Sequence, residues 1–327
     1  MREDAECNKP IESKDAPPWQ SAPDYALGMS TTSARLRELL DNAAASSTCL
    51  MMPGAFNALC ALAIKQAGFQ ASYVSGAATS VSAGVPDVGI LTLDHFVSLI
   101  REIVDASGLP LIADADTGFG ESEMVRRTVI EYARAGAAGL HLEDQVFPKR
   151  CGHLDGKKLI PLDHAVEKVA AAASAAKQAN NFIICARTDA RGVEGFDAAV
   201  SRAAAYLKAG ADMIFPEGLV SEQEFANFAT QLRAAAGSGH KYHLLANMTE
   251  FGKTPIIPAT RFGELGYSCV IFPVSLLRTA MGAVSRALEQ LKADGSVNGF
   301  LDQMQNREQL YKLIDYKPGV EWNFPAR

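Results

Sequence analysis

The chain has 327 residues, of which 48% are hydrophobic and 21% are charged, and its formal net charge is −6. A chain of this length buries a large core without disulfides, and its mild acidity argues against nucleic acid as a partner. No apolar run approaches the ~20 residues of a membrane-spanning helix, and the six cysteines include no C-x-x-C pair, so we expect a cytoplasmic protein with no membrane partner.

Residues 1–30 are polar, and acidic side chains outnumber basic ones there. The stretch lacks both the apolar centre of a signal peptide and the arginine-rich pattern of a transit peptide. We therefore predict a disordered tail over 1–30, followed by a catalytic unit over 31–292 and a helical extension over 293–327.

From residue 48 onward, short apolar runs alternate with alanine-rich amphipathic segments. The predicted strands are 49–52, 71–74, 109–113, 138–142, 182–186, 212–215, 242–246 and 269–272. The predicted helices begin near Phe56, Leu93, Glu121, Leu162, Phe196, Ser221, Pro258 and Ser275. Eight right-handed βαβ units in succession close on themselves, so the pattern predicts an α/β protein with a (β/α)₈ TIM barrel.

An open doubly wound sheet is the alternative fold. It would be expected to carry G-x-G-x-x-G after the first strand, and Pro53-Gly54-Ala55-Phe56 does not match that motif. A further helix, predicted over 297–313, falls outside the eightfold pattern. We expect the extension that contains it to pack across the barrel or onto a neighbouring subunit.

Polar side chains follow the predicted strands. Read in chain order they are Ser75 and Gly76, Asp114 and Asp116, Glu143 and Asp144, Arg187 and Asp189, Glu217, and Asn247 and Thr249. In a barrel the carboxyl ends of all strands share one face, which carries the chemistry. Because so many like charges repel one another, we expect a hard cation on this rim.

The pair Asp114 and Asp116 is the best candidate for holding that cation. A spacing of two puts both carboxylates on one side of an extended chain. Magnesium typically takes one or two carboxylates and keeps several waters, whereas zinc would need a His/Cys set that this sequence lacks. A helix-capping loop before Glu121 is the alternative interpretation, and the nearby Glu143 argues against it.

The segment Lys149-Arg150-Cys151-Gly152-His153 follows the fourth predicted strand. Three basic side chains flank one thiol, and cationic neighbours favour a thiolate that can exchange a proton. An exposed basic loop with an incidental cysteine is the alternative. His141 lies within a predicted core strand, and we interpret it as structural.

With these residues in place, the chain resembles the isocitrate lyase and phosphoenolpyruvate mutase superfamily from about Ser33 to Tyr316. The 149–153 segment resembles that superfamily's lyase signature. Supporting segments are 73–76, 114–120, 139–145, 186–190 and 215–217, while 247–252 and 304–307 resemble the 2-methylisocitrate lyases within it. Two positions depart from the pattern: Ser75-Gly76-Ala77-Ala78 lacks extra glycines, and Met248 stands where isoleucine is common.

The resemblance implies cleavage of 2-methylisocitrate, a 2-hydroxy tricarboxylate, to pyruvate and succinate in propionate catabolism. It implies Mg²⁺, with Mn²⁺ as a substitute, and a homotetramer that exchanges C-terminal helices between subunits. Isocitrate itself fits less well, because isocitrate lyases carry a large insertion and a tryptophan where this chain has Phe215. The smaller ring leaves room for a substrate methyl, which is worth only ~1–3 kcal/mol of discrimination.

The resemblance also implies roles for individual residues. Asp114 and Asp116 would hold the ion, supported by Asp87 and Glu143, and Ser75, Gly76 and Ala77 would cradle the pyruvate half. Arg187 would neutralise oxygen charge, and Tyr73 would help take the hydroxyl proton. The succinate half would be held by Gly152, Glu217, Asn247, Thr249, Arg278 and Arg307. Cys151 would protonate the carbanion from a lid, with Lys149, Arg150 and His153 beside it.

Two other interpretations remain. The dimethylmalate lyases and oxaloacetate acetylhydrolases share much of this pattern, whereas phosphonate mutases resemble the cysteine loop poorly. A barrel kept only for binding or assembly is the third interpretation, and the intact set of acids, arginine and cysteine argues against it.

Overall fold

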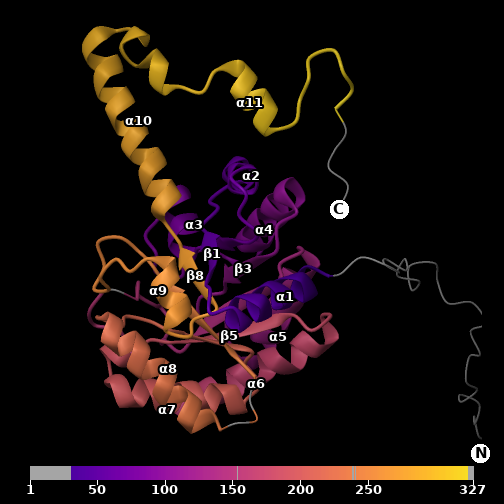
Figure 1. Ribbon diagram of the computed structural model, residues 1–327, viewed down its shortest axis with the longest axis vertical. Helices are drawn as coiled ribbons and strands as arrows, with labels where there is room; N and C mark the ends of the chain where they lie inside the picture. Colours follow the sequence, from indigo (N-terminus) through magenta and orange to yellow (C-terminus); the bar gives the residue numbers. More distant parts are fainter. Residues whose placement is uncertain (1–30, 153, 238, 240, 323–327) are drawn as a thin grey trace, which may run out of the picture. The chain divides into compact units, whose positions relative to one another are not determined.

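The computed structural model describes residues 31–152, 154–237, 239 and 241–322 (Figure 1). The tail predicted over 1–30 and the candidate catalytic residue His153 lie outside the described residues. None of the helices in the described ranges is both long and apolar enough to cross a lipid bilayer.

Eight parallel strands form the centre of the protein. They are β1 (Leu50–Pro53), β2 (Ser72–Val74), β3 (Leu111–Asp114), β4 (Gly139–Glu143), β5 (Ile183–Thr188), β6 (Met213–Pro216), β7 (His243–Asn247) and β8 (Cys269–Phe272). Neighbouring strands pair in the order β1-β8-β7-β6-β5-β4-β3-β2. A bridge between Gly54 and Tyr73, with a 2.8 Å hydrogen bond from the Ala55 amide to the Tyr73 carbonyl, brings β1 to β2. The predicted barrel is confirmed, and the open doubly wound sheet is wrong.

Helices surround this sheet (Figure 1). The longer ones are α1 (Thr32–Ala45), α2 (Ala58–Gln66), α4 (Leu93–Ser107), α5 (Ser122–Arg134), α6 (Leu162–Gln178), α7 (Phe196–Lys208) and α8 (Glu222–Ala236). Shorter helical segments are α3 (Gly76–Ser82), η1 (Ala190–Gly192) and α9 (Ala259–Glu264). In α4 the apolar residues Phe96, Ile100 and Ile103 recur at helical spacing and are fully buried, which fixes the face that packs inward.

Helix α1 was not predicted, and it closes the end of the barrel opposite the predicted rim. Leu36 and Leu40 are fully buried and pack with inward-facing strand residues such as Ile112. The Ser33 hydroxyl donates to the Ala138 carbonyl at 3.0 Å, at the amino end of β4. Since one end is plugged by apolar side chains, only the other end is open for chemistry.

The C-terminal region consists of α10 (Ser275–Asp294), η2 (Asn298–Gln303) and α11 (Arg307–Leu313). The single helix predicted over 297–313 is therefore wrong. Met304 is extended, and Asn306 starts a new helix by accepting from the Gln309 amide at 2.9 Å, while the Gln309 side chain accepts from the Asn306 amide. Asparagine prefers this local capping to continuing a helix, which explains the break.

Candidate active site

The carboxyl ends of the strands gather most of the predicted site residues, as a barrel requires. Arg187 on β5 connects two neighbouring strands, because its guanidinium lies 3.2 Å from Glu143 at the end of β4 and 3.6 Å from Glu217 just after β6. The Asn247 amide on β7 donates to Glu217 at 3.1 Å. These contacts form a continuous polar surface across one half of the rim.

The β3 carboxylates are held by backbone amides. Asp114 accepts from the Gly76 amide at 3.0 Å and from the Asp116 amide at 2.9 Å. A Cβ atom at Gly76 would lie 2.6 Å from an Asp114 oxygen, so only glycine allows this approach. Ser75 caps α3 by accepting from the Ala78 amide at 3.2 Å. In the segment predicted to cradle the pyruvate half (Ser75, Gly76 and Ala77), the backbone therefore supports the Asp114 carboxylate.

Burial and mutual repulsion perturb these acids in different directions. Burial and the neighbouring Asp114 raise the pKa of Asp116 to about 6. Burial also raises the pKa of Glu143 well above its usual value, although Arg187 and Lys149 oppose it. Burial would raise the pKa of Asp114 as well, but His141, Lys149 and Arg187 hold it below its usual value. The positive charge around the carboxylates on this side of the rim is therefore too small to keep all of them ionised.

Lys149 supplies part of that charge. Its ammonium group lies 2.8 Å from Asp116 and contacts Asp87, and the side chain is only 2% exposed. From the sequence we predicted that Lys149 would act on Cys151. In the structure its ammonium group instead contacts the carboxylates of Asp116 and Asp87. Arg150 donates to the Asp155 carbonyl at 3.2 Å. Cys151 is half-buried and forms no disulfide.

The acid side of the rim fits a hard divalent cation. Both oxygens of Glu143 and one of Asp116 are buried without a well-aligned hydrogen bond in the described part of the chain, although each residue has an ion pair. Such oxygens suit a cation that brings its own waters. No three His, Cys, Asp or Glu side chains among the described residues already converge as a ligand set.

The β5 side of the rim has balanced charges. Arg187 makes two hydrogen bonds to Asp189, at 3.0 and 3.1 Å, and its guanidinium lies 5.2 Å from the centre of the Phe215 ring. A Cβ atom at Gly152 would lie 2.5 Å from both Arg187 and Glu217, so the backbone of the cysteine loop rests directly on these two side chains. The loop therefore covers the rim at Gly152, next to Cys151.

The contacts of His141 could not be predicted from its place in an apolar strand. Its Nε2 atom lies 2.6 Å from the Tyr73 hydroxyl and 3.6 Å from Asp114, and the ring packs edge-on against Phe215. Burial lowers the pKa of His141 to about 4 and raises the pKa of Tyr73 well above 10, so both stay neutral. The available signal was a polar residue inside an otherwise apolar strand.

Two of the predicted arginines lie away from these contacts. Arg278 is exposed and donates to the Glu250 carbonyl at 2.6 Å, with its guanidinium over the Phe251 ring. Arg307 is the first residue of α11 and is exposed, and no hydrogen bond or ion pair joins it to the rim within the described residues. Thr249, by contrast, is buried just beyond β7.

Comparison with known proteins agrees with this geometry. The model of the phosphoenolpyruvate phosphomutase family matches residues 39–292. The chain belongs to this family. It is 50% identical to a protein of Corynebacterium glutamicum described as a probable 2-methylisocitrate lyase, over 86% of this chain and 90% of that protein. The 2-methylisocitrate lyase of Bacillus subtilis is 45% identical over 82% of this chain and 85% of its own. The predicted resemblance is confirmed.

Solved structures of family members have the same fold. A 2,3-dimethylmalate lyase, described as a PEP mutase/isocitrate lyase superfamily member, has a TM-score of 0.80 and 37% identity, over 88% of this chain and 92% of that one. An oxaloacetate acetylhydrolase bound to 3,3-difluorooxalacetate has a TM-score of 0.79 and 34% identity, over 87% and 93%. A phosphonopyruvate hydrolase, with a TM-score of 0.75 and 29% identity over 87% and 95%, contains oxalate and Mg²⁺.

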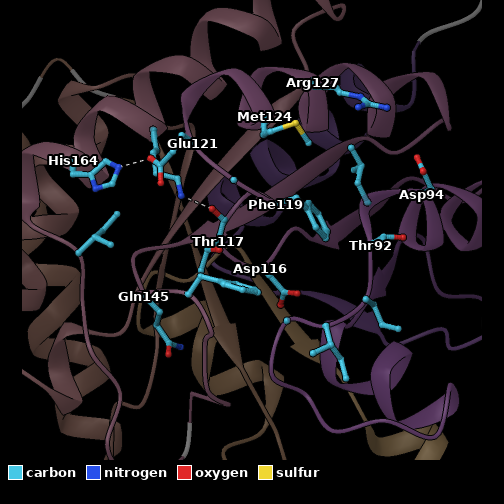
Figure 2. A pocket seen from close by; sticks show the side chains of 18 residues that line it. Thr92, Asp94, Asp116, Thr117, Phe119, Glu121, Met124, Arg127, Gln145 and His164 are labelled. Atoms are coloured by element: carbon cyan, nitrogen blue, oxygen red, sulfur yellow. Dashed lines mark hydrogen bonds and ion pairs between the residues drawn. The ribbon is translucent and has the colours of Figure 1, made fainter.

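A cavity of about 600 Å³ flanks the acid side of this family site. Figure 2 shows Asp116 and Thr117 at its wall, with Phe119 and Met124 nearby. The hydrogen bond between Glu121 and His164 lies at its edge. Of the predicted site residues, only Asp116 lines it, so this cavity lies beside the carboxylates and does not coincide with the polar surface around Arg187.

Proposed function

We propose that this protein is a magnesium-dependent carbon–carbon lyase that cleaves 2-methylisocitrate to pyruvate and succinate. The observation that carries the proposal is the contact of Gly152 with Arg187 and Glu217, which seats the cysteine loop on a rim of buried acids. The two 2-methylisocitrate lyases that match the chain at 50% and 45% identity support the choice of substrate.

Asp114 and Asp116 would hold the magnesium ion, partly through water, and Asp87 and Glu143 would support that site. When bound, the ion supplies Lewis-acid polarisation of substrate oxygens. Mn²⁺ would serve in its place, since it accepts the same oxygen ligands. The Mg²⁺ in the related phosphonopyruvate hydrolase supports this assignment.

The pyruvate half would bind near Ser75, Gly76 and Ala77, with Arg187 neutralising the charge that develops on its oxygen. Tyr73 would take the hydroxyl proton while passing its own phenolic proton to Nε2 of His141, 2.6 Å away, so that no free phenolate forms. The electrons of the broken carbon–carbon bond remain on the succinate fragment, and the Cys151 thiol would donate the proton that quenches them.

Residues on the lid and on β6 and β7 would hold the succinate half. Glu217, Asn247 and Thr249 line this side, and Asn247 has a buried side-chain oxygen without a hydrogen-bond partner in the described chain. Arg278 would pair with a substrate carboxylate after leaving Glu250. Arg307 would reach the site only from another subunit, because its own α11 leaves it exposed. Phe215 would border the substrate methyl, and the remaining basic lid residues, Arg150 and His153, would assist Cys151.

An oligomer that exchanges its C-terminal helices follows from the same reasoning. Of the 20 residues of α10 only Leu277 is buried, while Met281, Val284, Leu288 and Leu291 expose an apolar face. A face of this kind marks a protein interface. We propose a homotetramer, which light scattering after size exclusion would test: a monomer at micromolar concentration contradicts it.

The activity is tested by mixing the protein with Mg²⁺ and racemic threo-2-methylisocitrate and measuring pyruvate. A Cys151→Ser variant is the control, since it removes the proposed proton donor. We expect pyruvate and succinate in equal amounts from the unaltered protein. Release no greater than that of the control would refute the proposal.

A second candidate keeps the site and changes the substrate. The likeness to 2,3-dimethylmalate lyase, with a TM-score of 0.80, favours a trial of dimethylmalate, and oxaloacetate is tried for the same reason. Product masses from a panel of these acids decide between them. Faster turnover of either acid than of 2-methylisocitrate would replace the first candidate with the second.

A further inference from the structure

The loop that carries Cys151 has a second buried lysine. We define the lid as residues 146–152 and 154–158. Its base is closed by a hydrogen bond from the Val146 amide to the Lys158 carbonyl at 2.8 Å and by pairing of Gln145 with Leu159. Within the lid, the Lys157 side chain is only 5% exposed although it belongs to a surface loop. A long charged side chain is rarely buried unless it is paired.

The Lys157 ammonium group joins the lid to the barrel. It donates to the Gly152 carbonyl inside the lid and to an Asp189 oxygen, 2.8 Å away, at the end of β5. Gly192 of η1 borders the end of this side chain, because a Cβ atom there would lie 3.5 Å from the ammonium nitrogen. The ammonium group is thus enclosed between the lid and the loop that follows β5.

The carboxylate that receives Lys157 is the one that orients Arg187. Asp189 is fully buried, accepts two hydrogen bonds from Arg187, and donates its own amide to Asp144 at 2.9 Å. Burial would raise the pKa of Asp189, but Arg187 and Lys157 lower it to about 2. One rigid carboxylate therefore holds both the arginine of the site and the lysine of the lid.

The position of Gly152 depends on the same contacts. Its Cα faces Arg187 and Glu217 without room for a side chain, while its carbonyl accepts from Lys157. Any outward movement of the lid must break the Lys157 hydrogen bond to Gly152 or the ion pair with Asp189. The neighbouring Cys151 moves with Gly152.

We propose that Lys157 is a positioning residue that couples closure of the lid to the orientation of Arg187. It touches no reacting atom and acts through Gly152 and Asp189. The inference deepens the proposed function, because it assigns the control of Cys151 placement to a lysine six residues further along the chain. Removing the Lys157 charge leaves Asp189 one cationic partner, Arg187, so this carboxylate stays paired while the lid loses its ion pair with the barrel.

The test compares Lys157→Met with Lys158→Met. Lys158 is the adjacent, exposed lysine and serves as the matched control. The first readout is the rate at which iodoacetamide alkylates Cys151, followed by peptide mass spectrometry with Cys60 as an internal reference. We expect Lys157→Met to raise the Cys151 rate about 10-fold, as loss of a charge-assisted hydrogen bond predicts, and to leave Cys60 unchanged. Lys158→Met should match the unaltered protein at both cysteines.

A second readout separates positioning from general damage. Amide hydrogen exchange over 150–156 should become faster in Lys157→Met, while exchange in β5 and β6 stays unchanged. Lys157→Gln, which keeps a donor for Gly152 but loses the charge, should lie between the two and remains informative if the methionine variant does not fold. Equal alkylation and equal lid exchange in the Lys157 and Lys158 variants would overturn the inference.

Neither readout requires catalytic turnover, so the proposed reaction and the proposed role of Lys157 can be disproved independently. If the unaltered protein cleaves no 2-methylisocitrate but Lys157→Met still opens the lid, only the proposed reaction is wrong. If cleavage is present, we expect Lys157→Met to lower kcat about 10-fold, with a smaller change in KM, because closure positions Cys151 after substrate has bound. If the protein cleaves 2-methylisocitrate but both lid readouts are unchanged in Lys157→Met, the inference about Lys157 is wrong and the proposed reaction is still supported.

Discussion

The two sides of the rim bury similar groups, but the pKa values of Asp116 and Asp189 are shifted in opposite directions. On the β3–β4 side the pKa of Asp116 is raised to about 6 by burial and by Asp114, and burial also raises the pKa of Glu143 well above its usual value. On the β5 side the equally buried Asp189 has its pKa lowered to about 2, because Arg187 and Lys157 outweigh burial. Burial alone therefore does not set the charge of a carboxylate. Asp189 accepts hydrogen bonds from its cationic partners, whereas the Glu143 oxygens accept none in the described part of the chain, and hydrogen bonds to the charged form lower a pKa.

The two sides of the rim therefore have different roles. The β5 side is complete without a ligand, since Arg187 and Lys157 satisfy Asp189 and connect it to the lid. The β3–β4 side has more carboxylates than Lys149 can neutralise. A divalent ion would complete the second side and leave the first unchanged, so variants on the two sides should differ in their dependence on metal.

Asp114→Asn should produce the largest loss, because Asp114 accepts two backbone amides and would be a metal ligand. We expect activity to fall by about 10²–10³-fold, as when one preorganised electrostatic group is removed. Mn²⁺ binding, followed by electron paramagnetic resonance, should weaken in parallel. Asp94→Asn, an exposed aspartate lining the neighbouring cavity, is the control. Unchanged Mn²⁺ binding in Asp114→Asn would move the metal away from β3.

Arg187→Lys should lower kcat by about 10²-fold without weakening Mn²⁺ binding. Lysine keeps the charge but cannot form the two parallel bonds to Asp189, so its position over the substrate oxygen is lost. Arg191→Lys, at an arginine paired with Glu224 outside the rim, is the matched control. A kcat within twofold of the unaltered protein would show that Arg187 contributes charge alone.

Metal-free protein should lose stability as the pH rises through 6. Asp116 has a folded-state pKa above its unfolded value, so its contribution is fully present below pH 4 and is lost as it ionises among like charges. Asp116→Asn removes this loss. In EDTA the variant should exceed the unaltered protein in melting temperature by about 5 °C at pH 7.5, with a smaller difference at pH 5. A difference that shrinks with rising pH contradicts the assigned shift.

The barrel was predictable because each strand and helix is encoded by local periodicity. The spacing argument for Asp114 and Asp116 assumed an extended chain, whereas Asp116 lies beyond the end of β3 with a φ of 46°. The partners of Lys149 could not be predicted, since the path of a long loop depends on contacts with Asp87, which is far away in the chain. The same holds for Lys157, whose partner Asp189 is 32 residues distant. Sequence proximity to Cys151 suggested a role in thiol chemistry for Lys149, whereas in the structure both lysines contact carboxylates.

Other misses have simpler physical causes. Helix α1 precedes the repeating pattern of strands and helices, so that pattern could not predict it. His141 was taken as structural because it lies in an apolar strand, yet its ring reaches both Tyr73 and Asp114. The break before Asn306 was overlooked because a capping box within a polar segment interrupts helical periodicity by only a few residues.

Lys253→Met should have the smallest effect and tests whether the lid is held at one point or along its whole edge. Lys253 pairs with Asp155 of the lid at 2.5 Å, but the two side chains are 45% and 93% exposed. Exposed pairs are screened by water and salt and contribute little. We expect kcat and Cys151 alkylation to change by less than about twofold, at both low and high salt. A change as large as that of Lys157→Met would mean that the outer edge of the lid shares the control assigned to Asp189.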